Sequence, residues 1–476
     1  MKKFYITTAI DYPSGRPHLG HLYEKISADV LARWKKLKGF EIHFSTGTDC
    51  HGLKLQRAAE KAEKNPEQYV KEISKIFKEL CRTFNISYDD FIMTTEKRHE
   101  KVVIDILKKI DKKGDIYLGD YEGLYCVDCE TFYTEKDLKD GCCPYHHNKK
   151  IEKIREETYF FKLSKFQKDI IKNIENNDLI WPEKKKIEIL NRLKEPLKDL
   201  SISRANVKWG IPLPFDTKKT IAVWVDALIN YLSTVDYPNK KFKNFWPATH
   251  IIGSDIVWHH TAIWYSILLS IGLPLPKVIV HGFVNINGEK MSKSNGLVID
   301  PLSLAKKYPI DTLRYFLIRN IAFGQDGDFS EKKLEERHNN ELADKLGNLV
   351  SRVSALAEKY GIEKCENKLI KNLKEKEIEK KMENYELDKA LSLIFEFIDS
   401  CNKYVQENKL WETHDKKKIY ELVDSIKVIA VLLFPFIPST CEKITKVFNF
   451  KISWKEINKP VKISAIKKAE ILFKKV

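Results

Sequence analysis

The first fifty residues carry the pattern of a strand, a helix and a second strand, which constrains the fold more than any other part of the chain. The apolar run Phe4 to Ile10 predicts a short buried strand, and apolar residues then recur every four positions until Gly39 ends the predicted helix. A second predicted strand, Phe40 to Phe44, follows directly. This order is typical of a doubly wound parallel sheet, whose ligands bind at the carboxyl edge of the strands. We therefore expect a ligand site just after Ile10.

The alternation of strands and helices breaks in the middle of the chain and then resumes. From about Gly123 to Trp209 a Cys/His cluster and Lys/Glu-rich helical segments interrupt it, which indicates an insertion. Short β-branched runs at Ile221 to Val225, His250 to Ile252 and Lys277 to Val280 predict further strands of a parallel sheet. We therefore expect one sheet that is built from two separate stretches of sequence.

Strand signals largely vanish after about Glu331. Long amphipathic segments at Leu342 to Lys359, Tyr385 to Glu407 and Lys416 to Leu433 predict a helical bundle instead. The predicted division is a first half of the sheet domain, an insertion, a second half, a connecting segment and a helical domain, at residues 1–119, 120–213, 214–300, 301–340 and 341–476.

The chain is strongly basic, with a formal net charge of +16 over 476 residues. A basic surface concentrates nucleic acid because binding releases counterions, so the charge favours a polyanionic partner. The alternative is that lysine serves only solubility, since many lysines lie in Lys/Glu helical faces. Charge by itself therefore leaves a nucleic-acid partner undecided.

Nothing in the sequence predicts a membrane segment or an exported protein. The longest apolar stretches, Ile263 to Ile271 and Val428 to Ile437, are far shorter than the roughly 20 residues of a spanning helix. The N-terminal run meets Asp11 too early for a signal peptide. Nine cysteines, an odd number, argue against a secreted disulfide framework. We therefore expect a cytoplasmic protein.

Two histidines open the first predicted helix, in Pro17-His18-Leu19-Gly20-His21. The backbone N–H groups and the dipole at a helix start attract phosphate, so imidazoles there can face a triphosphate. A metal site would need a third ligand at fixed spacing, whereas Gly20 suits the close approach of a phosphate. A histidine pair without a ligand remains the plainer alternative, because short motifs also arise by chance.

A lysine signature, Lys290-Met291-Ser292-Lys293-Ser294, lies on a predicted loop between the turn signals Asn287-Gly288 and Asn295-Gly296. Two ammonium groups on such a loop can close on ATP and stabilise the charge that develops on its α-phosphate and on the departing pyrophosphate. Chance occurrence in a lysine-rich chain is the alternative. One site can use both signatures only if the two halves of the sheet meet, and we expect them to.

With these signatures, four further segments resemble the class I aminoacyl-tRNA synthetases, and among them the branch that takes methionine. The segments are Thr46 to Gly52, Val223 to Ala227, His250 to Ile256 and Phe323 to Ser330, and the resemblance covers essentially the whole chain. It implies an α/β fold with a Rossmann-like doubly wound parallel sheet that is split by a zinc-knuckle insertion and followed by an all-α anticodon-binding helical bundle. The implied ATP-binding residues are His18, Gly20, His21, Gly253, Asp255, Lys290, Ser292 and Lys293, of which the histidines and lysines are catalytic.

The resemblance also implies a methionine pocket with one carboxylate. Aromatic walls suit an apolar, polarizable thioether, and the carboxylate of Asp49 suits the substrate ammonium. Without the resemblance, core packing would be the simpler explanation of these aromatic residues. The implied pocket residues are Ile10, Tyr12, Asp49, Trp224, Leu228, Tyr231, Ile256, His260 and Trp264.

Four cysteines and two histidines form a candidate zinc knuckle. Two residues lie between Cys126 and Cys129, and thirteen lie between Cys129 and a second candidate pair that begins at Cys143. This is the spacing of a tetrahedral zinc site. Redox use or unpaired buried thiols are the alternatives. Spacing leaves Cys142 and His147 open as ligands, whereas the family pattern favours Cys143 and His146. One structural zinc per chain is expected.

Three residues of the helical region match the anticodon readers of the family, Asn348, Arg352 and Trp411. Unstacked RNA bases are recognised by aromatic stacking and by hydrogen bonds to their edges. A lone tryptophan at a helix start is more often part of a core, so this assignment depends on the resemblance. The chain departs from frequent family residues at four positions: Cys50, Leu228, Ser254 and Leu410.

The implied reaction joins methionine to tRNA(Met), elongator and initiator, through methionyl-adenylate, with ATP and Mg²⁺ as reactants. A monomer is expected, because no appended domain is visible after the bundle. Another class I synthetase is the nearest rival, but the chain has no room for a large editing insertion. A small adenylating enzyme would lack the knuckle and the bundle, and a zinc-containing RNA-binding protein without catalysis leaves both signatures unexplained.

Overall fold

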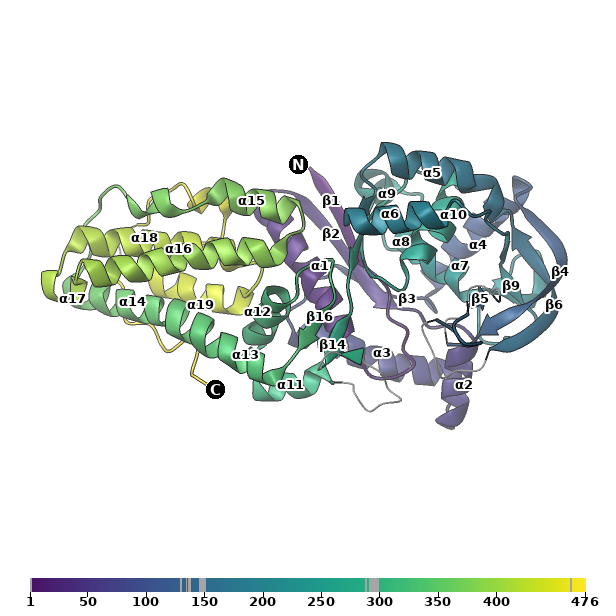
Figure 1. The fold of residues 1–476 in the computed structure, drawn as a ribbon, viewed down its shortest axis with the longest axis horizontal. Coiled ribbons are helices and arrows are strands. Elements are labelled where there is room, and N and C mark those ends of the chain that lie inside the picture. Colours follow the sequence, from purple (N-terminus) through teal and green to yellow (C-terminus); the bar gives the residue numbers. More distant parts are fainter. Residues whose placement is uncertain are drawn as a thin grey trace.

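The computed structural model describes residues 2–128, 131–133, 135, 138–144, 151–286, 289–290, 299–462 and 465–476. Ser292, Lys293, Cys129 and His146 therefore lie outside the described residues, and only the backbone of Lys290 is described. Figure 1 shows a sheet domain on one side and a helical bundle on the other, joined along α1, with the two ends of the elongated molecule formed by β4–β6 and by α17.

A six-stranded parallel sheet forms the centre of the first domain, with the strand order β3-β2-β1-β12-β13-β7. β1 pairs with β2 on one side and with β12 on the other, so the two stretches of sequence form one sheet, as predicted. The strand order reverses at this point, which is where doubly wound sheets bind ligands. The strands are β1 Lys3–Thr8, β2 Glu41–Thr48, β3 Asp90–Met93, β7 Ile180–Trp181, β12 Thr249–Gly253 and β13 Lys277–His281.

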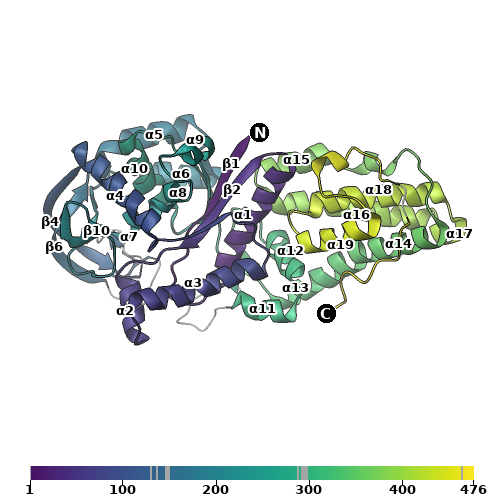
Figure 2. The same ribbon diagram turned by 180° about the vertical axis from the view of Figure 1, so that it is seen from behind.

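Helices cover both faces of this sheet, and the β-strand period of two decides which residues face them. Ile251 packs with α1 and the helical bundle, whereas its neighbour Ile252 packs with α4 and α10 on the opposite face. Figure 2 shows α1 between the sheet and the bundle from behind. The helices of this domain are α1 Leu19–Leu37, α2 Leu53–Lys61, α3 Pro66–Thr83, α4 Lys97–Lys112, α5 Gln167–Asn176, α6 Glu183–Arg192, α7 Val223–Leu228, α8 Asn230–Ser233, α9 Lys240–Phe245 and α10 Trp264–Ile271, with a π-helical turn at His259–Ile263 and a 3₁₀ turn at Leu163–Phe166.

The predicted parallel strand Ile221 to Val225 is wrong. Residues Asp216–Ile221 form β11, which pairs antiparallel in a small separate sheet, and α7 begins at Val223. The β-branched residues of this run bury themselves in a short helix because the carboxylate of Asp226 is hydrogen-bonded by two histidines. Tertiary contacts thus overrode local strand preference.

The insertion forms an antiparallel sheet of its own at one end of the molecule (Figure 1). It also sends one strand, β7, to the edge of the large sheet, which the sequence pattern did not predict. The additional strands are β4 Ile116–Cys126, β5 Thr131–Tyr133, β6 Glu152–Phe161, β8 Leu200–Ser201, β9 Ser203–Arg204, β10 Pro212–Leu213 and β11 Asp216–Ile221.

The C-terminal region is a helical bundle, as predicted. Its three expected helices are α14, α16 and α18, and a π-helical stretch at His338–Gly347 precedes α14. The elements after β13 are β14 Val284–Ile286, β15 Glu289–Lys290, α11 Pro301–Lys307, α12 Ile310–Asn320, β16 Gly327–Phe329, α13 Glu331–Arg337, α14 Asn348–Tyr360, α15 Glu375–Glu383, α16 Leu387–Glu407, α17 Leu410–Thr413, α18 Lys416–Leu433 and α19 Pro438–Phe448, with 3₁₀ turns at Leu369–Asn372 and Trp454–Glu456. Within the described residues, no helix is both long and apolar enough to cross a bilayer. The bounds of the five predicted segments stay predictions.

Candidate active site

The carboxyl ends of three neighbouring strands bring several of the predicted ATP-site and methionine-pocket residues to one edge of the large sheet. Ile10 and Tyr12 follow β1, Asp49 follows β2, and Asp255 and Ile256 follow β12. Because parallel strands end on the same side, residues that are far apart in the chain come together there. The edge includes the point where β1 lies between β2 and β12.

His18 and His21 lie side by side at the start of α1. His18 is the N-cap, and its Nδ1 accepts the N–H of Gly20 at 3.1 Å, while its own N–H donates to Nδ1 of His21 at 3.0 Å. The ring centroids are 3.7 Å apart. The imidazoles thus satisfy N–H groups that a helix start leaves without backbone partners, and they are held at its positive end.

An ion pair connects the histidine signature to the segment that follows the lysine signature. Arg16 lies two residues before His18, and its guanidinium donates to Oδ2 of Asp300 from Nη2 at 2.9 Å and from Nε at 3.1 Å. Asp300 also caps the N-terminus of α11. The ion pair therefore holds the start of α11 beside the loop that precedes α1.

Gly253 and Ser254 turn the chain sharply at the end of β12. A Cβ atom on Gly253 would lie 2.7 Å from Oδ1 of Asp255, so a larger residue would displace that carboxylate. Ser254, which stands where the family often has lysine, donates its hydroxyl to the carbonyl of His281 at 2.9 Å. This hydrogen bond directs the Ser254 side chain to the neighbouring strand end.

His281 and Glu24 form a buried pair at this edge that sequence reasoning missed. Nε2 of His281 lies 3.1 Å from Oε2 of Glu24, and both side chains are almost fully buried. Burial opposes the charged imidazole, but the hydrogen bond to Glu24 raises the pKa of His281. The available signal was the position of His281 directly after the predicted strand Lys277 to Val280.

The floor of the predicted methionine pocket contains two buried histidines, His250 and His260, and both are uncharged. The hydroxyl of Tyr231 lies 2.8 Å from Nε2 of His260, whose Nδ1 lies 3.0 Å from the carbonyl of Ile256. Trp264 donates from Nε1 to Nε2 of His250 at 3.2 Å. Burial lowers the pKa of His260 to about 4 and holds that of His250 well below its usual value, so both rings are neutral at pH 7.

The remaining predicted pocket residues lie around this floor. Trp224 stacks on His259, a residue that was not predicted, with ring centroids 3.8 Å apart. Leu228 packs in the same core cluster as Tyr231, and Ile10 is half-buried. Tyr12 donates its hydroxyl to the carbonyl of His51 at 2.9 Å.

A buried carboxylate links the strand end that carries Asp49 to α7. Asp226 accepts hydrogen bonds from Nδ1 of His51 and Nε2 of His99, each at 2.7 Å. Burial opposes its ionisation, but His51 and His99 outweigh this and lower the pKa of Asp226 to about 2. The cluster therefore connects the loop after Asp49 to the helix that carries Trp224.

Cys50, a departure from the family, is a buried and inert thiol. Its sulfur contacts Oγ1 of Thr48 at 3.3 Å and Oγ of Ser74 at 3.9 Å, and burial raises its pKa to about 12. Its backbone carbonyl accepts Nε1–H of Trp209 at 2.6 Å. A protonated thiol at pH 7 does not compete with Asp49 for an ammonium group.

Two of the four expected zinc ligands are described. Cys126 ends β4 and is 1% exposed, and Cys143 is fully buried, whereas Cys142 is half-exposed. Among the residues that the structure describes, no three His, Cys, Asp or Glu side chains form a metal group. Cys129 and His146 lie outside those residues.

The predicted anticodon residues lie on the surface of the bundle. The guanidinium carbon of Arg352 lies 5.7 Å from the ring centre of Trp411, and Asn348 is exposed one turn earlier on α14. Trp411 is 41% exposed and therefore is not a core residue. Figure 1 shows α17, which carries Trp411, at the end of the molecule opposite β4 and β6.

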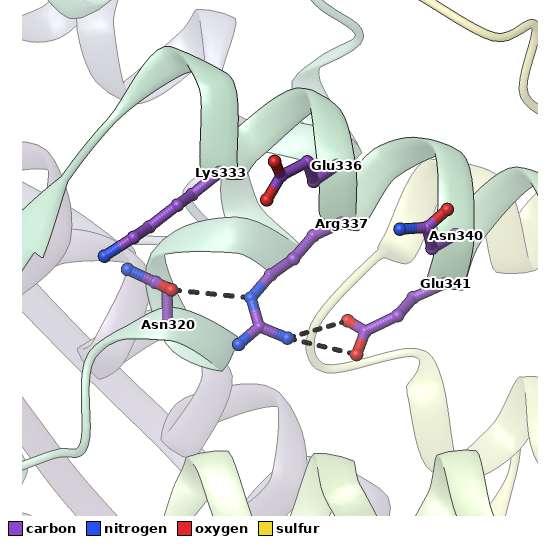
Figure 3. Close-up of a pocket in the computed structure, with 6 residues that line it drawn as sticks. All are labelled: Asn320, Lys333, Glu336, Arg337, Asn340 and Glu341. Atoms are coloured by element: carbon purple, nitrogen blue, oxygen red, sulfur yellow. Dashed lines mark hydrogen bonds and ion pairs between the residues drawn. The ribbon is translucent and has the colours of Figure 1, made fainter.

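A separate hollow of about 420 Å³ lies in the connecting region, between α12 and the π-helical stretch (Figure 3). Arg337 there donates to both carboxylate oxygens of Glu341, at 3.0 and 3.1 Å, and to Oδ1 of Asn320 at 3.4 Å. Because the cation already has an anionic partner within the protein, we assign no ligand to this hollow.

Two family models match the chain. The model described as class I tRNA synthetases (M) matches residues 4–154 and 146–354, and the model described as the anticodon-binding domain of tRNA ligase matches residues 366–474. Methionine–tRNA ligase of Caldanaerobacter subterraneus is 41% identical over 506 aligned positions, covering 100% of this chain and 79% of the relative. Methionine–tRNA ligase of Thermotoga maritima is 40% identical, covering 94% of this chain and 76% of the relative.

A solved structure has nearly the same fold over the whole chain. Mycobacterium tuberculosis methionyl-tRNA synthetase in complex with methionyl-adenylate superimposes with a TM-score of 0.95 and 32% identity, covering 99% of this chain and 100% of that one. The apo form of the same enzyme superimposes with a TM-score of 0.88 and 29% identity. The chain therefore belongs to the class I aminoacyl-tRNA synthetases, in the methionine–tRNA ligase family.

Proposed function

We propose that this chain activates methionine with ATP at the carboxyl edge of its large sheet and then transfers the methionyl group to the 3′ end of tRNA(Met). The observation that carries this proposal is the stacked pair of His18 and His21 at the positive end of α1, beside the sheet edge where β1 lies between β2 and β12. The solved relative that holds methionyl-adenylate supports the same intermediate here.

Adenylate formation uses the positive end of α1 and the lysine loop. The methionine carboxylate attacks the α-phosphorus of ATP in line, and the bond from that phosphorus to the bridging oxygen of pyrophosphate breaks. His18, His21, Lys290 and Lys293 stabilise the negative charge that builds on the transferred phosphate and on the leaving group. ATP enters with Mg²⁺ bound to its phosphates, which neutralises part of that charge.

Methionine binds with its thioether over the uncharged pocket floor, which Tyr231, His260 and Trp264 form, and with its ammonium at Asp49. A neutral pocket floor suits a substrate side chain without charge, since an ionised imidazole in the floor would have to be desolvated without compensation. The indole of Trp224 is a polarizable wall for the sulfur. Selectivity for methionine over a polar amino acid of similar length follows from these contacts.

Transfer to tRNA needs no dedicated general base, because the mixed anhydride of methionyl-adenylate is already reactive. A ribose hydroxyl at the 3′ end attacks the activated carbonyl carbon, and the bond to AMP breaks. Asn348, Arg352 and Trp411 read the CAU anticodon of elongator and initiator tRNA at the opposite end of the molecule. Figure 1 shows α17 at the far end of the bundle, away from the large sheet, so an elongated ligand is needed to contact both regions at once.

A structural zinc ion held by Cys126, Cys129, Cys143 and His146 would stabilise the insertion, which lies where the acceptor end of tRNA arrives. Three thiolates and one imidazole suit tetrahedral zinc and leave no open position for catalysis. The burial of Cys126 and Cys143 beside the more exposed Cys142 supports this choice of ligands. We further propose a cytoplasmic monomer.

Methionine-dependent exchange of labelled pyrophosphate into ATP tests the proposal. Wild-type protein is expected to catalyse exchange with methionine alone among the amino acids, and Lys293→Ala is expected to lose most of it while still binding tRNA. Lys168→Ala, an exposed lysine on α5, is the matched control and keeps full exchange. Exchange driven by leucine or valine, or full activity of Lys293→Ala, contradicts the proposal.

A further inference from the structure

A fully buried ion pair lies directly behind the histidine signature. Nζ of Lys25 lies 2.5 Å from Oδ2 of Asp11, and the two side chains are 0% and 4% exposed. Lys25 comes one helical turn after His21 on α1, among apolar neighbours such as Leu22 and Ile26. Burying two charges is costly, and an apolar pair of similar volume often gives equal or greater stability. The pair therefore calls for a role other than stability.

The second oxygen of Asp11 faces His21. Oδ1 of Asp11 lies 4.0 Å from Nε2 of His21. Because Nδ1 of His21 accepts the N–H of His18, the proton of the neutral ring is on Nε2, the nitrogen on the Asp11 side. A carboxylate there favours this tautomer and the charged form of the ring.

The backbone of Asp11 is fixed independently of its side chain. Its N–H donates to the carbonyl of Gly47 at 2.8 Å, and its carbonyl accepts the N–H of Asp49 at 2.8 Å. The carboxylate is thus held on a rigid strand end, beside the residue proposed to bind the methionine ammonium. A substitution of the Asp11 side chain leaves both backbone contacts in place.

The other charged groups near this pair lie on α1, α3 and β13. Glu24 directly precedes Lys25 on α1 and is already hydrogen-bonded to His281. The buried thiol of Cys81, on α3, lies near Lys25. Burial raises the pKa of Asp11 to about 6 against the opposing effect of Lys25, so the carboxylate is ionised at pH 7.5. The ammonium of Lys25 remains charged beside it.

We infer that Asp11 is a positioning residue for adenylate formation: anchored by Lys25, its carboxylate lies 4.0 Å from Nε2 of His21 and stabilises positive charge on that ring while pyrophosphate departs. The inference rests on the role proposed above for His21. A carboxylate that holds a catalytic imidazole in one tautomer and favours its cation acts through that imidazole and touches no substrate.

The test is pyrophosphate exchange by Asp11→Asn/Lys25→Met, which removes both charges together and leaves no buried ion unpaired. We expect kcat to fall about tenfold or more, which corresponds to about 1.4 kcal/mol of barrier. The KM values for methionine and ATP are expected to stay within about twofold, because the backbone contacts to Asp49 remain. Asp11→Asn/Lys25→Gln, which replaces the ion pair by a hydrogen bond, is the second variant should the first not fold.

His21→Asn, alone and combined with the double variant, separates this inference from the proposed function. We expect the double substitution to have no further effect when His21 is already replaced. An unchanged kcat in a folded double variant, or an equal loss in the presence and absence of His21, overturns the inference alone. Full activity of His21→Asn overturns the catalytic role proposed for His21 as well.

Discussion

Asp29→Asn is expected to destabilise the protein strongly, because Asp29 accepts hydrogen bonds from two arginines in a buried cluster that joins α1 to the helical bundle. Oδ2 of Asp29 accepts Nη2 of Arg314 at 2.6 Å and Nε of Arg33 at 2.7 Å. Arg314 is fully buried, and it also donates to the carbonyls of Pro435, Phe436 and Phe84, at 3.0, 3.0 and 2.9 Å. Burial opposes ionisation of Asp29, but Arg314 and Arg33 lower its pKa.

The expected loss follows from the bonds that the amide cannot make. The Asn oxygen can keep the hydrogen bonds from Ser87, but its NH₂ group would then face two guanidinium donors. Two charge-assisted bonds at about 1.5–3 kcal/mol each are lost, in agreement with about 3–5 kcal/mol for breaking a buried ion pair. This is a large share of a typical free energy of unfolding of about 5–15 kcal/mol.

Urea unfolding followed by circular dichroism measures the effect, and the midpoint should fall by about 1 M or more. Asp29→Leu/Arg314→Met removes both members of the fully buried pair, while Arg33 keeps its hydrogen bonds to Asn85, and should recover much of the loss. Glu67→Gln, which breaks an exposed ion pair with Lys71, is the control and should leave the midpoint unchanged. A change below about 1 kcal/mol in Asp29→Asn would refute the assigned importance of this cluster.

Three further predictions concern other parts of the molecule. The pKa of Asp226 is depressed to about 2 in the folded protein, against about 3.9 in the unfolded chain. Ionised Asp226 therefore contributes roughly 2.5 kcal/mol to the free energy of unfolding above about pH 3.9, and this contribution is lost as the pH falls toward 2. Urea unfolding of the wild type should show this loss, and urea unfolding of Asp226→Asn should not. Trp411→Ala should raise the KM for tRNA about tenfold or more in aminoacylation, since stacking of an RNA base on an aromatic side chain contributes about 1–3 kcal/mol. A tenfold loss of pyrophosphate-exchange activity, which needs no tRNA, would contradict this role. Cys143→Ser should lose bound zinc by elemental analysis and unfold at a lower temperature, whereas zinc loss in Cys142→Ser instead would reverse the ligand assignment.

Much of the fold was predictable because its signals are local. The apolar period of four residues gave the course of α1. A local signal of the same kind lies at the start of α3, where Asn65 precedes Pro66 and its side chain accepts the N–H of Glu67. The helices α16 and α18 appear within two residues of their predicted bounds. Caps and periodicity act over one or two turns, so they can be recognised without knowing what packs against them.

The prediction failed where distant contacts outweighed local preference. Val223 and Val225 favour a strand, yet they lie in α7 because Asp226 is held by His51 and His99 from two other elements. The edge strand β7 consists of two residues, Ile180 and Trp181, too few for any recognisable period. Both features depend on partners 98 or more positions away, and no local pattern encodes those partners.

By itself, the sequence determined the family, the order of the elements and the identity of most candidate site residues, since motifs are contiguous and keep their meaning before folding. Only the tertiary structure decided that Arg16 meets Asp300, that Trp411 is exposed, and that Asp11 stands between Lys25 and His21. Burial and distance set whether a charged side chain is paired, and both arise only when separate segments pack together.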